Sequence, residues 1–182
     1  METIDVTTPV TIRRALPGDE HALALVGAAT FLETFSGILD GAAIVEHCAR
    51  AHAPVQYAGW LHDARCALWL AEMVPGGAPV GYAVVAPADL PTANAGRDLE
   101  LKRIYLLGRF QGGGSGSRLL QHAIGHAAAA GAARLLLGVY AGNHAAQAFY
   151  RHKGFVHLAD RVFHVGGQGY DDHVMGLVLR TD

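Results

Sequence analysis

The chain has 182 residues, of which 51% belong to the hydrophobic set and only 16% are charged. This length suffices for one sizeable core and is short for two, so we predict one domain over residues 1–182. The 14 Lys and Arg against 16 Asp and Glu leave a net charge of -2, without the basic excess that proteins use to bind nucleic-acid phosphates. The composition excludes a disordered chain and argues against a nucleic-acid partner.

Targeting signals are not evident in the pattern. The first ten residues lack the basic start and the apolar stretch of a secretory signal. The most apolar tract, 127–139, is interrupted by an arginine and two glycines and is shorter than the roughly 20 apolar residues of a membrane span. Cys48 and Cys66 have no CxxC spacing, and we expect two reduced thiols. We predict a cytoplasmic protein with no membrane partner.

Hydrophobic periodicity and turn residues predict mixed helices and strands. In the first half, the pattern predicts a strand at 10–15, a helix from the turn 17–19 to about Gly37 and a helix after the N-cap Asp40. It then predicts a short helix at 55–61 and a hairpin formed by 66–73 and 80–85. In the second half, the pattern predicts an extended strand at 98–107, a glycine-rich loop at 108–116 and a helix at 117–130. A strand at 134–140, a helix at 143–153 and strands at 155–165 and 172–179 follow. This order predicts an α/β domain with a mixed sheet.

The segment 111–117, Gln-Gly-Gly-Gly-Ser-Gly-Ser, lies between a predicted strand and a predicted helix. Glycines let the backbone approach a ligand, and the helix N-terminus adds partial positive charge, so the segment suits a phosphate group. It lacks the lysine of a P-loop, and no acidic residue follows where a dinucleotide fold needs one. A plain flexible loop is the alternative.

Two regions resemble a known family. The run 99–106, Leu-Glu-Leu-Lys-Arg-Ile-Tyr-Leu, with the Gln-x-x-Gly-x-Gly of 111–116, resembles motif A of the GNAT superfamily of acetyl-CoA-dependent N-acetyltransferases. The segments 139–143 and 148–155 resemble its motif B. Within the superfamily the chain is most similar to the PaiA-type polyamine N-acetyltransferases, through the run 99–105, the helix at 30–35 and the ending at 164–172.

The resemblance implies a GNAT-like, mostly antiparallel sheet with helices on both faces and a splayed pair of central strands. It implies acetyl-CoA as cosubstrate, with its pantetheine arm along the first splayed strand and its pyrophosphate in the glycine loop. The cofactor-binding residues implied in this way are Ile104, Tyr105, Leu106, Gln111, Gly112, Gly113, Gly114, Ser115, Gly116, Ser117, Asn143 and Lys153. The chain departs from the family where Gly108 replaces a usual proline, Gly113 a frequent basic residue and Ser115 a usual bulky aliphatic residue, so we expect modest cofactor affinity.

Aminolysis of a thioester requires two proton transfers. An alkylamine with a pKa of about 10.4 is almost fully protonated at neutral pH, so a base must remove a proton before the nitrogen attacks. Glu100 matches the family's acidic position, and its alternative is a carboxylate paired with Lys102 or Arg103. Tyr150 matches the usual donor to the leaving thiolate, and its alternative is a half-buried aromatic residue.

We predict an acceptor site at the first helix, formed by Phe31, Glu33 and Phe35, because aromatic and acidic side chains suit an aliphatic cation. The spacing of the two phenylalanines fits core packing equally well. Further candidates are three acids and one of five later histidines: Asp40, Glu46, Asp172, His144, His152, His157, His164 and His173. His122 and His126 lie one helical turn apart without a third ligand, so we predict no metal.

The sequence therefore predicts direct acetyl transfer from acetyl-CoA to a primary amine of a small molecule, for which the resemblance favours a polyamine. A protein N-terminal or antibiotic-amine acetyltransferase and a non-catalytic acyl-CoA sensor are the alternatives. Family members often dimerise through sheet edges or C-terminal strands, so the resemblance also makes a homodimer an expectation.

Overall fold

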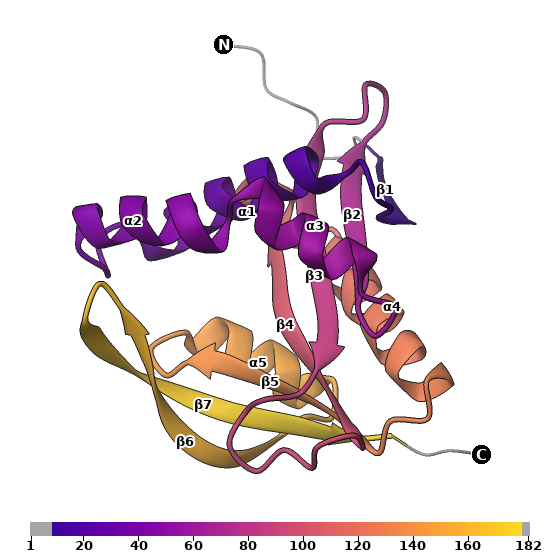
Figure 1. Ribbon diagram of the computed structural model, residues 1–182, viewed down its shortest axis with the longest axis vertical. Helices are drawn as coiled ribbons and strands as arrows, with labels where there is room; N and C mark the ends of the chain where they lie inside the picture. The colour runs from indigo at the N-terminus through magenta and orange to yellow at the C-terminus, as the bar shows by residue number, and fades with distance from the viewer. Residues whose placement is uncertain (1–8, 180–182) are drawn as a thin grey trace.

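The computed structural model describes residues 9–179 and contains a seven-stranded sheet of order β1-β2-β3-β4-β5-β7-β6 (Figure 1). The strands are β1 (Val10–Arg14), β2 (Ala67–Met73), β3 (Pro79–Pro87), β4 (Asp98–Leu106), β5 (Arg134–Tyr140), β6 (Val156–Val165) and β7 (Gln168–Val178). The helices are α1 (Glu20–Phe35), α2 (Gly41–Ala51), α3 (Pro54–His62), α4 (Ser115–Ala129) and α5 (His144–His152), with a 3-10 turn, η1 (Gly108–Phe110). Neighbouring strands pair antiparallel except β4 and β5, which pair parallel. The predicted mixed, mostly antiparallel sheet is confirmed.

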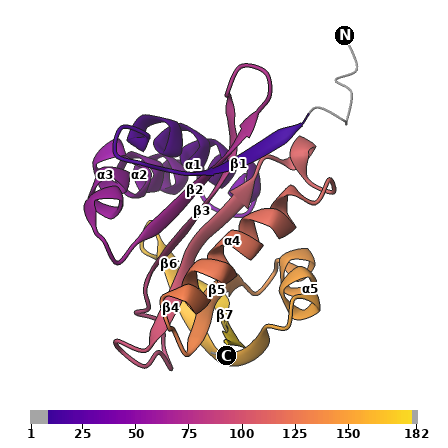
Figure 2. The same cartoon turned by 90° about the vertical axis from the view of Figure 1, so that its right-hand side faces the viewer.

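Helices cover both faces of the sheet (Figure 2). Successive side chains of β2 point to opposite faces: Leu68 and Leu70 pack with α1 and α3, whereas Trp69 packs with α4. Tyr150 of α5 joins the cluster on the α4 side. Within residues 9–179 no helix combines the length and the apolar character needed to cross a membrane.

The central strands β4 and β5 separate soon after they meet. They pair only at Asp98–Arg134, Leu99–Leu135 and Glu100–Leu136. A β-bulge in β4 follows at once, because Arg103 lies opposite Val84 and Leu101 opposite Val85, which leaves Lys102 as the extra residue. A bulge bends a strand and increases its twist. Figure 1 shows the result: β3 and β4 run almost vertically, whereas β5 and β7 cross the lower part of the molecule. The predicted splay is confirmed.

Two element starts lie two or more residues earlier than predicted. Helix α4 begins at Ser115, since Gly114 at φ 82° provides the left-handed residue from which the helix starts. Strand β7 begins at Gln168, since Gly166 and Gly167 have φ values of 58° and 78° and form a two-residue turn that pairs Val165 with Gln168. The sequence pattern had assigned all four residues 166–169 to the turn.

A buried ion pair joins β4 and β5 where they meet. Nη2 of Arg134 lies 2.6 Å from Oδ2 of Asp98, whose side chain is 0% exposed. The backbone N–H of Asn94 donates to the same oxygen at 2.8 Å. Burial raises the pKa of Asp98, but these donors outweigh it and hold that pKa below its usual value.

We expect Asp98→Asn to lower the free energy of unfolding by about 3 kcal/mol, because it leaves the Arg134 guanidinium without its buried counterion. The depressed pKa means that wild type has this stabilisation above the unfolded-state pKa of about 3.9 and loses it as pH falls through the lower folded-state value. Urea unfolding at several pH values measures both effects. Glu46→Gln, which removes an exposed pair with Arg50 on α2, should change little. Equal losses in the two variants would contradict the assignment.

Candidate active site

The separation of β4 from β5 opens a cavity of about 1240 Å³. It extends from the N-terminus of α4, between the two strands, to α1 and the β6–β7 hairpin. Ligand sites for one small molecule usually measure about 300–1,000 Å³, so this cavity has room for two substrates at once.

One half of the cavity is built on β4 and the glycine loop. Apart from the bulged Lys102, residues 101–106 of β4 pair with β3 on one side, and among the described residues they have no strand partner on the other. The Gln111 side chain donates from Nε2 to the carbonyl of Leu106 at 2.9 Å and so closes the loop. Gly112 and Gly114 have φ values of 83° and 82°, a conformation that L side chains rarely adopt. The loop thereby presents backbone amides beside the N-terminus of α4.

Most predicted cofactor residues line this half: Ile104, Tyr105, Leu106, Gln111, Gly112, Gly114, Gly116, Ser117 and Asn143. Three do not. Ser115 is buried and its Oγ accepts from Arg118 at 3.1 Å. Lys153 caps α5, with its Nζ 5.7 Å from the centre of the Phe149 ring, and Gly113 lies exposed outside the lining. Asn143 lines the cavity, but its side chain caps α5 by accepting from the N–H of Ala146.

Glu100 lies at the point where the strands part, and its side chain is 7% exposed. Its Oε2 lies 2.8 Å from Nζ of Lys102 and accepts the N–H of Asp89 at 3.2 Å. Burial raises the pKa of Glu100, and the charge of Lys102 limits that rise. The carboxylate lines the cavity and also forms the Lys102 pair that the sequence offered as the alternative.

Tyr150 lines the cavity from α5, with its ring 5.4 Å from Phe149 and 5.7 Å from Phe155. Burial raises the pKa of the Tyr150 hydroxyl above its usual value, and the neighbouring Tyr105 adds to this. The phenol therefore stays protonated throughout the physiological range and keeps a proton to donate.

All three predicted acceptor residues, Phe31, Glu33 and Phe35, line the opposite half of the cavity. Phe31 also belongs to a buried cluster, and its ring lies 4.6 Å from that of Phe35, so core packing and cavity lining coincide here. Oε2 of Glu33 accepts the N–H of Gly108 at 2.8 Å, which ties α1 to the loop after β4. A proline at position 108 has no N–H to donate.

Several other acceptor candidates are corrected by the structure. Asp40 caps α2 by accepting from Ala43, and Glu46 is exposed beside Arg50, so neither lines the cavity. Asp172 does line it, paired with Arg161 at 2.9 Å. None of the five later histidines lines it. Two earlier histidines line the cavity instead: His47 in α2 and His52 at its C-cap.

Sequence reasoning missed a polar cluster around Arg103. Its Nη1 donates to the Tyr57 hydroxyl at 2.8 Å, and that hydroxyl lies 2.8 Å from Nδ1 of His52. Gly27 of α1 leaves room for this cluster, because a Cβ at that position would overlap the Tyr57 hydroxyl. Burial, and then the charge of Arg103, lower the pKa of His52 to about 3, so this imidazole is neutral. Side-chain contacts of Arg103 with α3 and with the C-cap of α2 bring together residues that are far apart in sequence.

The guanidinium of Arg103 also stacks on aromatic rings. Its Cζ lies 4.9 Å from the centre of the Trp60 ring and 5.4 Å from that of Tyr57. Within residues 9–179, no carboxylate lies within 4.0 Å of it. Arg103 is thus a cation that lines the cavity without a counterion among the described residues.

Comparison with known proteins identifies the family. The model of the Acetyltransferase (GNAT) family matches residues 32–155. Uncharacterized N-acetyltransferases from Mycobacterium tuberculosis and Mycobacterium bovis are each 32% identical over 157 residues, which cover 86% of this chain and 96% of the relative. The chain belongs to the GNAT family of N-acetyltransferases.

Solved structures show the same fold. The PaiA N-acetyltransferase of Thermoplasma acidophilum, in complex with coenzyme A, aligns with a TM-score of 0.71 at 17% identity over 93% of this chain and 99% of that one. The ribosomal-protein-alanine N-acetyltransferase of Brucella melitensis aligns with a TM-score of 0.65 at 24% identity over 93% and 99%. The two neighbours have different names and similar TM-scores, so the likeness shows the fold and does not identify the acceptor.

Proposed function

We propose that this protein transfers the acetyl group of acetyl-CoA directly to a primary amine of a small molecule. One observation carries the proposal: Glu100 and Tyr150 both line the cavity where β4 and β5 part. A base for the amine and a proton donor for the thiolate are the two groups that thioester aminolysis requires.

The residues present fit acetyl-CoA, which supplies the thioester. The unpaired edge of β4 can bind an extended arm as an added strand would. Gly112 and Gly114 keep the loop free of side chains, with no atom within 4 Å of a Cβ at either position, and the N-terminus of α4 favours negative charge. Coenzyme A bound to the PaiA neighbour supports this cosubstrate.

Glu100 and Tyr150 have separate tasks in this proposal. Glu100 accepts the ammonium proton, directly or through a water, and its raised pKa brings it closer to the value that a base needs at neutral pH. Tyr150 donates its hydroxyl proton or a hydrogen bond to the departing sulfur. Neither Cys48 nor Cys66 lines the cavity, which supports attack by the amine without a cysteinyl intermediate.

Two acceptor classes remain in competition. A polyamine, which the resemblance favours, needs a carboxylate for its distal ammonium. Three of the acids that line the cavity already have cationic partners, since Glu100 and Asp89 pair with Lys102 and Asp172 pairs with Arg161. Glu33 accepts only the neutral N–H of Gly108, so it is the one lining acid among the described residues that keeps an uncompensated charge for an ammonium. The specific observation that favours a second candidate is Arg103, whose uncompensated charge suits an acceptor that carries an anionic group beside its amine, as an amino acid does.

We expect Gly114→Val to abolish the rise in melting temperature that acetyl-CoA causes. At 100 times its dissociation constant a ligand adds about 2.7 kcal/mol of stability, whereas a side chain at φ 82° costs roughly 1–2 kcal/mol and displaces the loop amides. Differential scanning fluorimetry with and without acetyl-CoA measures the shift. Gly125→Ala, at an exposed position of the same helix, should keep it. An unchanged shift in Gly114→Val would remove the loop from the cofactor site.

We expect Tyr150→Phe to lower kcat by roughly 100- to 10,000-fold while acetyl-CoA still binds, because only the donor hydroxyl is lost. Thiol release in the presence of an accepted amine gives the rate, and calorimetry gives the affinity. Tyr82→Phe is the matched control, since it removes a fully buried hydroxyl that does not line the cavity and has no hydrogen-bond partner among the described residues. Full activity in Tyr150→Phe would reduce Tyr150 to a packing residue.

We expect amino acids to be acetylated faster than their carboxamides, which lack the anion, and faster than spermidine. Arg103→Gln should raise KM for the amino acid by about 30-fold or more, because losing one partner of a desolvated charge pair costs at least about 2 kcal/mol. The carboxamide should show little change. If spermidine is the preferred acceptor and Arg103→Gln leaves its KM unchanged, the polyamine class replaces the amino-acid class while acetyl transfer stands.

A further inference from the structure

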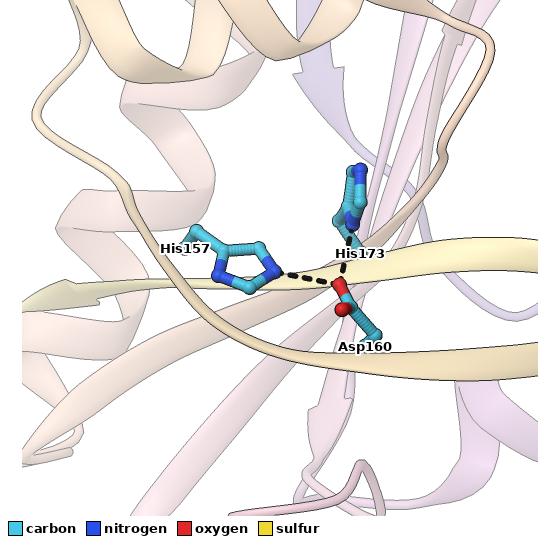
Figure 3. A group of neighbouring side chains, drawn as sticks. All are labelled: His157, Asp160 and His173. Atoms are coloured by element: carbon cyan, nitrogen blue, oxygen red, sulfur yellow. Dashed lines mark hydrogen bonds and ion pairs between the residues drawn. The ribbon is translucent and has the colours of Figure 1, made fainter.

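Three side chains of the metal-binding types meet on the β6–β7 hairpin, away from the cavity lining (Figure 3). Nε2 of His157 lies 2.8 Å, and Nδ1 of His173 lies 2.7 Å, from the same oxygen, Oδ1 of Asp160. The three candidate ligand atoms all lie within 4.8 Å of one another. In the part of the chain that the structure describes, no other three histidine, cysteine or acidic side chains come this close.

The pairing of β6 with β7 creates this group. Asp160 lies directly opposite His173, so their side chains share one face of the sheet. His157 lies three residues before Asp160, a spacing that normally places two side chains on opposite faces. A β-bulge between His157 and Ala159 inserts Leu158 and shifts the alternation, so that His157 reaches the face of Asp160. The bulge therefore turns His157 toward Asp160 and His173 and brings the three side chains together.

We propose that His157, Asp160 and His173 bind one divalent transition-metal ion, of which Zn²⁺ is the best match. Two imidazole nitrogens and one carboxylate oxygen are a common three-residue zinc ligand set, with a fourth position left to water. Mg²⁺ and Ca²⁺ prefer oxygen ligands throughout and are poor matches.

The geometry allows the ion to enter with small adjustments. Tetrahedral zinc with bonds of about 2.0–2.1 Å needs its ligand atoms about 3.3–3.4 Å apart, slightly more than the distances that separate the histidine nitrogens from Asp160. The Asp160 side chain is 74% exposed and that of His157 50% exposed, so both are free to move outward. His173, 31% exposed and held on the central strand of the three-stranded half β5-β7-β6, is the fixed ligand.

The proposed ion would lie behind one wall of the active-site cavity. The next residue pair along the hairpin, Arg161 opposite Asp172, points to the other face and lines the cavity. An ion bound by Asp160 on β6 and His173 on β7 would therefore link the two strands on the face opposite to Arg161 and Asp172. The site is separate from the proposed acetyl transfer, and its test does not depend on activity.

Calorimetric titration of the full chain, without an affinity tag, with ZnCl₂ tests the proposal. We expect one equivalent of Zn²⁺ to bind with a dissociation constant in the micromolar range, and MgCl₂ to give no binding heat. His173→Ala and Asp160→Asn should each weaken Zn²⁺ binding about tenfold or more. Zn²⁺ should also raise the melting temperature of wild type and not that of His173→Ala.

Two histidine variants are matched controls. His164→Ala changes an exposed histidine further along β6, and His122→Ala removes one member of the histidine pair on α4. Both should bind Zn²⁺ as wild type does. The proposal fails if wild type binds no Zn²⁺, which would leave the group as a hydrogen-bonded cluster only, or if His173→Ala and Asp160→Asn bind as wild type does. Loss of binding in either control would place the ion elsewhere and equally overturn the assignment.

Discussion

The cavity at the candidate active site depends on one constraint, which is that β4 cannot follow β3 and β5 at the same time. It pairs with β3 along nearly its whole length but with β5 over only three residue pairs, and the bulge at Lys102 bends it away immediately afterwards. The Asp98–Arg134 pair holds the two strands together at the start of this short ladder, and they diverge after Glu100. The unpaired edge of β4, the cavity and the position of Glu100 all follow from that divergence. An ordinary continuous ladder would fill the space with backbone hydrogen bonds and leave no site.

The charges within the cavity show how a buried polar site is kept stable. Unpaired buried carboxylates are costly, and the two buried acids that line the cavity have cationic partners: Lys102 for Glu100 and Arg161 for Asp172. Arg103 differs, because its neighbours are the Tyr57 hydroxyl, a neutral imidazole and aromatic faces. Such an environment tolerates a guanidinium without neutralising it, and this leaves its charge available to a ligand.

Local pattern in the sequence was enough to predict most of the fold. Asp40 and Gly131 act as the caps that their residue types indicate, and the strand at 134–140 matches β5. Cavity residues carried by a motif, such as Glu100 and Tyr150, could also be placed. The Arg103 cluster could not, because it depends on contacts between α3 and β4, about 50 residues apart, and on room left by Gly27. The sequence offered five later histidines as acceptor candidates, whereas His47 and His52 line the cavity. Which of the eleven histidines faces the cavity depends on how distant elements pack together, which no local pattern encodes.

The β6–β7 hairpin shows how the alternation of a strand lets one element have two roles. Arg161 and Asp172 face the cavity, where Gly138 of β5 leaves them space, since a Cβ there would overlap the Arg161 guanidinium and approach Asp172 to 3.0 Å. Asp160 and His173, one position along, face outward with His157. A one-residue slip of this register would exchange the two sets and destroy both. The tight turn at Gly166 and Gly167 and the bulge at Leu158 fix the register at both ends of the hairpin, so the same two backbone features determine the cavity wall and the outward histidine pair.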